Sequence, residues 1–170
     1  FSFFPEKTEY FNPSNSDSML NLRVADLETT RALLTKNGIV VDAKVESHEY
    51  GRFGWAIDCD GRKVELWEPI DKGFDDYHKP MELLGNVTGL GGVFLKSKNA
   101  KLSAEWYSKN FGMDFTSSYC NLEWRDLYHK ENICNTVFSF FPQDTNYFGK
   151  STKDFMLNFR VKNLDELLKE

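Results

Sequence analysis

The stretch FSFFPEKTEYFNPSNSDSMLNLRVADL at Phe1–Leu27 returns as FSFFPQDTNYFGKSTKDFMLNFRVKNL at Phe138–Leu164. The two copies are 137 residues apart without a gap, and 16 of the 33 positions that can be compared are identical. This period is too long for a solenoid unit and matches the size of a whole domain. We therefore expect the chain to hold the back part of one domain copy, followed by the front part of the next.

A weaker repeat lies within this period. MLNLRVADLETTRALLTKNG at Met19–Gly38 resembles GVFLKSKNAKLSAEWYSKNFG at Gly92–Gly112. Both stretches fit a strand, a polar break and a helix that ends with Lys-Asn before a glycine. The likeness favours two related modules in each domain copy, although any strand and helix ended by glycine would share part of it.

The first module has a clear order of elements. Residues 18–24 alternate between apolar and polar, which predicts a strand with Asn21 and Arg23 on one face. Asp26 suits the N-cap of a helix, and Gly38 suits its C-terminal stop. An Asp-Gly turn at residues 60–61 joins two further apolar runs. The expected elements are a strand over 18–24, a helix over 27–37 and strands over 39–46, 51–57 and 62–68.

The second module repeats this order. Asn99 is a predicted helix cap, and Gly112 is the predicted stop. The expected elements are a strand over 90–97, a helix over 100–110 and strands over 113–119, 122–128 and 133–141. A strand over 155–161 and a helix from Leu164 then begin a third unit. One helix for several largely antiparallel strands indicates an α+β fold.

Composition limits the classes of function. The 170 residues are 41% apolar and 28% charged, which is near the usual globular mix. The net charge of −5 disfavours a nucleic-acid surface. No apolar run approaches the roughly 18–20 residues of a membrane span. The three cysteines cannot all pair within one chain. We expect a cytoplasmic protein with reduced cysteines and with neither nucleic-acid nor membrane partners.

Two stretches resemble the signatures of a known superfamily. GRFGWAIDCDGRKVELWEP at Gly51–Pro69 resembles the closing signature of the vicinal-oxygen-chelate superfamily, which includes glyoxalase I, bleomycin-resistance proteins and extradiol dioxygenases. GLGGVFLKSKNAKLSAEWYSKNFGM at Gly89–Met113 is similar to the opening signature. The resemblance implies paired βαβββ modules that form a cleft between curved mixed sheets. The order here is permuted, because the back module precedes the front module.

The repeat and the resemblance together divide the chain. The two modules can pair within one chain, or between chains as a swapped homodimer. The strands near Met19 and Met156 are then expected to compete for one position in a sheet. The expected segments are 1–16, the end of a front module from a preceding copy; 17–69, the back βαβββ module; 70–86, a linker; 87–142, the front βαβββ module; and 143–170, the truncated start of a repeated back module.

The resemblance also implies four positions where superfamily members hold a divalent metal ion. Glu65 matches the glutamate of the family's Glu-Leu pair. Gly92 stands at the position on the first strand of the front module and has no ligating atom. Met19 or Met156 stands on the first strand of the back module, and a thioether is a poor ligand for hard ions. The last strand of the front module offers Ser139, Phe138 or Phe140. One ligand, Glu65, remains, so we expect no metal cofactor, with a site of altered ligands as the alternative.

Polar and aromatic side chains are predicted on the cleft face. An arginine, an asparagine, a carboxylate and aromatic rings can hold an anionic or aromatic small molecule, because guanidinium recognises carboxylates at two points. The alternative is an internal ion pair that satisfies the sheet interior. The candidate ligand-binding residues are Asn21, Arg23, Phe53, Trp55, Glu65, Asn158 and Arg160.

Three functions remain open. The first is a glyoxalase- or bleomycin-resistance-like module that binds a small organic molecule without the family metal. The second is a metal-dependent lyase, isomerase or dioxygenase with an altered ligand set around Glu65. The third is a degenerate structural domain without a ligand. Enzymatic activity and the identity of catalytic residues are therefore left open by the sequence.

Overall fold

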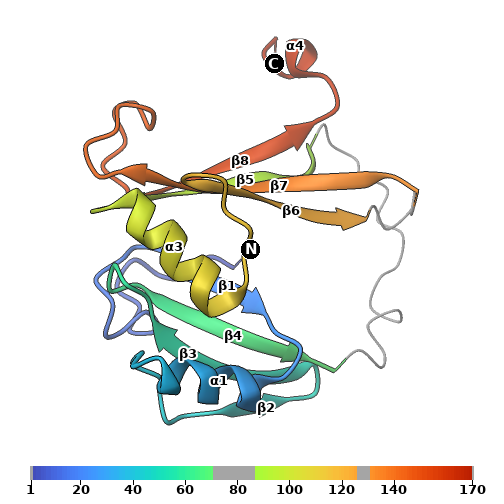
Figure 1. Cartoon of the computed structure of the whole chain (residues 1–170). Coiled ribbons are helices and arrows are strands. Elements are labelled where there is room, and N and C mark those ends of the chain that lie inside the picture. Colours follow the sequence, from blue (N-terminus) through green and yellow to red (C-terminus); the bar gives the residue numbers. More distant parts are fainter. Residues whose placement is uncertain (1, 71–86, 126–130, 170) are drawn as a thin grey trace. The chain divides into compact units, whose positions relative to one another are not determined.

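The computed structural model describes residues 2–70, 87–125 and 131–169, and its class is α+β with two mixed four-stranded sheets (Figure 1). The predicted fold class is confirmed. The chain divides into two compact units, Phe1–Tyr77 and His78–Glu170. The expected linker over 70–86 lies outside the described residues except for Ile70.

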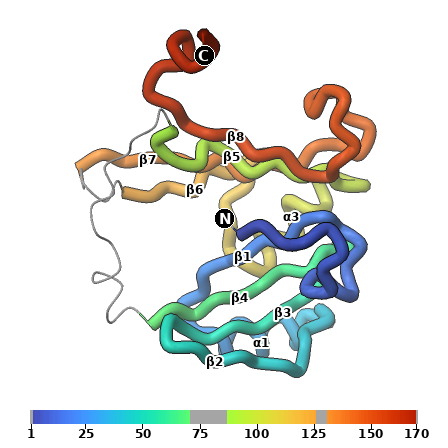
Figure 2. The backbone as a smooth tube through the Cα atoms, turned by 180° about the vertical axis from the view of Figure 1, so that it is seen from behind, coloured from blue at the N-terminus to red at the C-terminus, as the bar shows by residue number. Residues whose placement is uncertain are grey.

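The first unit is a βαβββ module. Its elements are β1 (Leu20–Arg23), α1 (Leu27–Lys36), β2 (Glu46–His48), β3 (Gly51–Ile57) and β4 (Lys63–Pro69). The strand order is β1-β4-β3-β2, with β1 parallel to β4 and the other pairs antiparallel (Figure 2). The helix α1 covers one face, where Leu27, Leu34, Val64 and Leu66 are fully buried. The opposite face carries the odd-numbered residues of β3 and β4.

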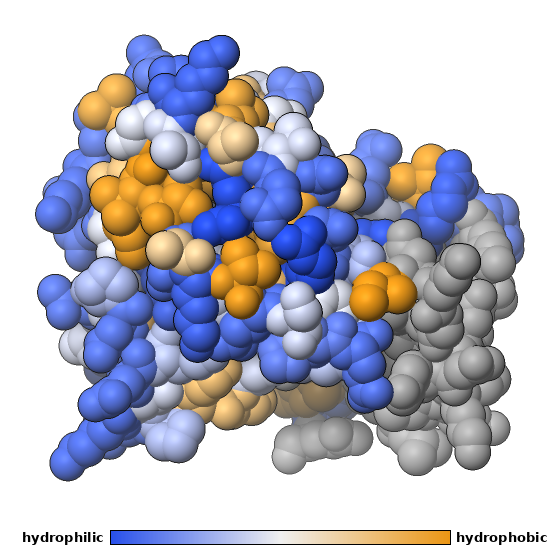
Figure 3. Space-filling model, turned by 90° about the horizontal axis from the view of Figure 1, so that it is seen from below, coloured by the Kyte–Doolittle hydropathy of each residue, from blue (hydrophilic) through white to orange (hydrophobic). Residues whose placement is uncertain are grey.

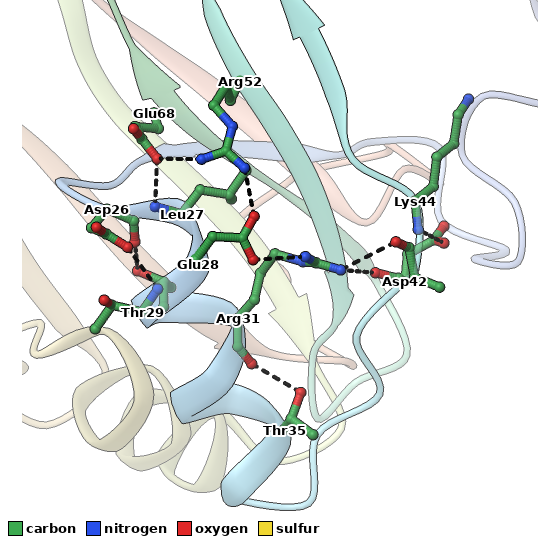
Figure 4. A network of polar contacts seen from close by, with 12 residues as sticks. Asp26, Leu27, Glu28, Thr29, Arg31, Thr35, Asp42, Lys44, Arg52 and Glu68 are labelled. Atoms are coloured by element: carbon green, nitrogen blue, oxygen red, sulfur yellow. Dashed lines mark hydrogen bonds and ion pairs between the residues drawn. The ribbon is translucent and has the colours of Figure 1, made fainter.

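Polar contacts fix the start of α1 on this sheet, as Figure 4 shows. The Asp26 side chain accepts a hydrogen bond from the Thr29 backbone N–H (2.6 Å), which confirms the predicted N-cap. Glu68 of β4 accepts a second bond from the Leu27 N–H (2.7 Å). Arg52 of β3 bonds Glu28 (2.5 Å). The first turn of the helix is therefore tied to two neighbouring strands.

The strand predicted over 39–46 is mostly absent. The structure has an isolated bridge between Val41 and Ala56, and β2 begins only at Glu46. The Asp42 carboxylate accepts the Lys44 N–H (2.9 Å), while Arg31 bonds the Asp42 carbonyl oxygen (2.9 Å). These local bonds compete with the strand ladder and turn the chain there.

The second unit has the order β5 (Val87–Ser97), α3 (Ala100–Phe111), β6 (Tyr119–Arg125), β7 (Ile133–Pro142), β8 (Phe155–Val161) and α4 (Leu164–Leu167). Its sheet has the order β6-β7-β5-β8, with β5 parallel to β7 and antiparallel to β8. The helix α3 buries Tyr107 against Phe138 and Phe140, at ring-centroid distances of 5.5 and 5.1 Å. Asn99 caps this helix, as predicted.

The prediction of a strand over 113–119 is wrong. The chain forms a tight turn there, with an isolated bridge between Thr116 and Tyr119 and a positive φ of 63° at Ser117. Phe115 is half-buried and packs against Phe138 and Phe140, so ring contacts hold the segment against the sheet in place of a backbone ladder. The strand predicted over 122–128 begins earlier, at Tyr119, and residues 126–128 lie outside the described part of the chain.

The strands near Met19 and Met156 lie in different sheets of this structure, and their competition for one sheet position stays a prediction. β1 lies beside β4 in the first unit, and β8 lies beside β5 in the second (Figures 1 and 2). The two closely similar strands therefore pair through different edges, β1 with a parallel strand and β8 with an antiparallel strand.

The face drawn in Figure 3 is mainly hydrophilic, with apolar side chains in separate groups, as is usual for a globular surface. In the described residues, none of the helices is both long and apolar enough for a membrane span.

Candidate functional site

The candidate site is centred on Glu65, in the middle of β4. Its backbone neighbours are Asn21 of β1 and Trp55 of β3, which occupy the same level of the sheet. Val64 and Leu66 point toward α1, so Glu65 points to the opposite, open face. Only 7% of Glu65 is exposed. Burial of a carboxylate requires compensating hydrogen bonds.

Three neutral donors supply those bonds. Asn21 Nδ2 donates to Glu65 Oε1 (2.5 Å), while the Tyr10 hydroxyl (2.6 Å) and Trp55 Nε1 (3.0 Å) both donate to Oε2. Hydrogen bonds to an ionised acceptor are stronger than those between neutral groups. The carboxylate is therefore stabilised by dipoles from three different segments of the first unit.

Tyr10 comes from the loop before β1 and covers the carboxylate. Its ring stacks on Phe4 (4.9 Å between centroids), and Lys63 Nζ lies 5.1 Å from its centroid. Lys63 Nζ also donates to the Tyr10 carbonyl oxygen (2.7 Å). Burial and the hydrogen bond to Glu65 together raise the pKa of the Tyr10 phenol well above its usual value. Tyr10 is therefore a neutral donor at physiological pH.

A row of aromatic rings continues along the same open face. His48 stacks on Tyr50 (5.3 Å), and Phe53 stacks on Trp67 (6.2 Å, 10° between planes). We call His48, Tyr50, Phe53 and Trp67 the aromatic row. Arg23 is the β1 partner of Trp67 in the sheet register, so the two side chains leave the sheet on the same face. Phe53, Arg23 and the Glu65 cluster thus share one face.

The other two predicted binding residues lie in the second unit. Arg160 of β8 donates from Nε to Thr88 Oγ1 (2.9 Å) and from Nη1 to Cys134 Sγ (2.7 Å), and its Cζ lies 5.2 Å from the Trp124 ring centroid. Asn158 packs against Gly91. The sheet that holds these residues is not the sheet that holds Glu65. The predicted set is therefore divided, and Asn21 and Arg23 are the pair beside Glu65.

The other positions implied for metal ligands have non-ligating surroundings. Met19 precedes β1, and Asn21 occupies the place beside Glu65. Gly92 packs against the Phe94 ring, and Met156 pairs with Phe94 across the β5–β8 ladder. Ser139 donates to the Ser118 carbonyl oxygen (3.3 Å). Among residues 2–70, 87–125 and 131–169, no group of three or more His, Cys, Asp or Glu residues is arranged to hold a metal ion.

The cysteines do not form a disulfide: Cys59 is exposed, and Cys120 and Cys134 are buried. Burial raises the pKa of the Cys120 thiol to about 11, so this thiol is protonated and weakly nucleophilic at neutral pH.

Sequence reasoning missed Tyr10, although the repeat carried a signal for it. Tyr10 and Tyr147 are equivalent in the repeat, and so are their neighbours Phe4 and Phe141. Tyr147 stacks on Phe141 at 4.8 Å and 16°, against 4.9 Å and 15° for Tyr10 on Phe4. The repeated loop therefore has a repeated structure, and its identical tyrosines were a usable sign of a structural role.

Comparison with known proteins identifies the fold. No family model matches the sequence, and no curated protein matches it. Among solved structures, the chain is similar to an Mn(II)-bound glyoxalase from Novosphingobium aromaticivorans (TM-score 0.50, 16% identity, 73% of this chain and 42% of that chain). It is also similar to a halotolerant catechol dioxygenase (TM-score 0.50, 11% identity, 89% and 53%). The chain spans about half the length of these proteins, and it shares their fold.

Proposed function

We propose that the first unit binds a small aromatic anion on its open face, in the manner of the metal-free, drug-sequestering branch of the superfamily. The observation that carries this proposal is the state of Glu65. Its carboxylate is used internally by Tyr10, Asn21 and Trp55, while Arg23 and the aromatic row share the same face. An arginine and stacked rings are the groups that recognise an aromatic carboxylate.

The donor set around Glu65 does not fit a divalent cation. The three donors occupy three of the roughly four lone-pair sites of the Glu65 carboxylate, and the positive ends of those N–H and O–H dipoles repel a cation. Asn21 and Trp55 are held by neighbouring strands, so these donors stay in place beside the carboxylate.

Two lysines lie beside Trp55 on the open face. Lys63 Nζ lies 5.2 Å from the Trp55 ring centroid, and Lys44 Nζ, which forms an ion pair with Glu46, lies 5.8 Å from it. The hydrogen bonds to Glu65 spread its negative charge onto neutral donors. The Phe53–Trp67 stack offers an apolar ring surface next to Arg23. A ligand with a ring and a carboxylate would contact both features at once.

The test is a fluorescence titration with phenylacetate, read through tryptophan emission. Phenylacetamide, which lacks the charge, and cyclohexylacetate, which lacks the aromatic ring, are the comparison compounds. We expect saturable quenching by phenylacetate and at least tenfold weaker binding in Arg23→Gln, about 1.4 kcal/mol. Arg52→Gln is the matched control, because Arg52 bonds Glu28 of α1 and faces away from the open face. Equal binding of the acid and the amide, or no binding of either, would contradict the proposal.

A further inference from the structure

The strand β6 is the outermost strand on one side of the second sheet (Figures 1 and 2). Its counterpart in the first unit is β3, which has the same antiparallel place beside the long parallel pair and is covered on its other side by β2. In the described part of the second unit, the chain turns before β6 and forms only the bridge between Thr116 and Tyr119 on that side. Beyond Tyr119, the outer edge of β6 therefore has no neighbouring strand among the described residues.

The hydrogen bonds to β7 show which backbone groups of β6 face outward. The Phe140 N–H donates to the Ser118 carbonyl oxygen (2.8 Å), so Ser118 and the even-numbered residues after it direct their backbone groups toward β7. Alternation turns the backbone N–H and C=O groups of Asn121, Glu123 and Arg125 toward the outer edge. This edge thus presents the pattern of donors and acceptors that an antiparallel strand requires.

The strand β6 has few of the features by which proteins block a sheet edge. Its sequence YCNLEWR contains neither proline nor lysine, and all of it pairs with β7 in one register without a bulge. Tyr119 and Leu122 are 43% and 39% exposed. Its two charged residues, Glu123 and Arg125, are exposed, have opposite signs and lie two positions apart on one face. Such an edge is suited to a strand with the reverse order of charges.

We propose that β6 of one copy of this chain pairs with β6 of a second copy, antiparallel, about a two-fold axis at Trp124. Antiparallel pairing reverses the order of charges, so Glu123 of each copy lies directly opposite Arg125 of the other. Both of these pairs exchange two backbone hydrogen bonds, because their backbone groups face the outer edge. Directly opposed side chains share a face, so each pair also brings a carboxylate beside a guanidinium. The two sheets then form one continuous sheet.

The structure disfavours the neighbouring registers. A two-fold axis at Glu123 would place like charges directly opposite each other, which is destabilising. An axis at Leu122 would bring Arg125 of the second copy beside Tyr119, whose carbonyl oxygen already accepts the Thr116 N–H (2.8 Å). The axis at Trp124 keeps the ladder over residues 123–125 clear of that bridge. The contact is short and its charged residues are exposed, so we expect a dimer that depends on concentration.

Charge reversal tests the pairing. Glu123→Arg and Arg125→Glu each place like charges opposite each other in a homodimer, and we expect each to weaken the dimer at least about tenfold in analytical ultracentrifugation. An equimolar mixture of the two variants restores both opposite-charge pairs and should dimerise as the native chain does. Lys101→Glu is the matched control, because Lys101 is an exposed cation on α3 that pairs with Glu105 of the same helix. It should leave the dimer unchanged.

Three results overturn the proposal. The first is a native chain that stays monomeric at its highest soluble concentration. The second is a native dimer that neither charge reversal weakens more than the Lys101→Glu control does. The third is a mixture of the two reversed chains that stays as monomeric as each chain alone.

Cross-linking tests the register without reversing any charge. A Glu123→Cys chain is mixed under oxidising conditions with a larger, tagged Arg125→Cys chain, and both carry Cys59→Ser to remove the exposed thiol. Directly opposed residues of an antiparallel pair lie within reach of a disulfide, so we expect a species of the summed mass on a non-reducing gel. Each chain oxidised alone is the control, because neither position lies opposite itself in this register. Cross-linking that is equally efficient in the single chains and in the mixture overturns the register.

Discussion

Replacing Tyr10 by phenylalanine removes one oxygen atom from the candidate site and leaves the ring in place. The hydroxyl donates to Glu65 Oε2 at 2.6 Å, and Glu65 is 7% exposed. A hydrogen bond to a charged group contributes about 1.5–3 kcal/mol, and loss of a donor leaves part of a buried carboxylate unsatisfied. Tyr10 itself is 37% exposed, so water can reach the vacated position. We therefore expect Tyr10→Phe to lower the free energy of unfolding by about 1.5–2 kcal/mol, the lower part of that range.

The assay is urea unfolding followed by tryptophan fluorescence, because Trp55 and Trp67 both report on the first unit. Tyr147→Phe is the matched control: Tyr147 has the same stacked environment, is 62% exposed, and its hydroxyl has no hydrogen-bond partner among the described residues. An exposed substitution of this kind should change stability by less than about 0.5 kcal/mol. If the two variants lose the same stability, the hydroxyl–carboxylate bond does not stabilise the first unit and the reasoning is wrong.

Three further predictions concern the first unit. The pKa of Tyr10 is raised in the fold, whereas an unfolded tyrosine ionises near pH 10. The contribution of Tyr10 to the free energy of unfolding should therefore be complete below about pH 10 and fall as the pH rises above it. Tyr10→Phe should flatten this fall in urea titrations at alkaline pH. Asp26→Ala should lower the melting temperature, as seen by circular dichroism, because the Thr29 N–H loses its capping acceptor. Gly51→Ala should lower the free energy of unfolding by well over about 2 kcal/mol, because φ is +144° and the new Cβ would clash with Trp67 Nε1. Gly61→Ala, where φ is +85° and no atom lies within 4 Å of the new Cβ, should lower it by about 1 kcal/mol in the same urea titrations.

Local signals in the sequence predicted the parts of the fold that local chemistry decides. The caps at Asp26 and Asn99, the stop at Gly112 and the Asp-Gly turn before β4 each depend on residues within a few positions. Alternation over 18–24 correctly indicated that Asn21 and Arg23 share one face of their strand, because side-chain parity follows directly from strand geometry. The candidate site could therefore be predicted as far as this strand.

What the sequence did not predict depends on contacts between distant segments. Tyr10 reaches Glu65 across 55 residues, and no local pattern shows which carboxylate a loop tyrosine will bond. The placement of β8 beside β5 was missed because nearly identical strands can pair through either edge. The prediction of a strand over 113–119 was wrong because Phe115 packs against Phe138 and Phe140 from a turn, and the local pattern does not show these distant contacts.

The central claim is that the open face binds an aromatic anion while Glu65 holds no metal. Isothermal titration calorimetry of phenylacetate, on protein treated with EDTA and analysed for metals before and after treatment, tests both parts together. The account predicts substoichiometric metal in the purified protein and the same dissociation constant before and after EDTA. Stoichiometric Zn, Mn, Fe or Ni that is absent from Glu65→Ala, together with loss of binding after EDTA, would contradict it.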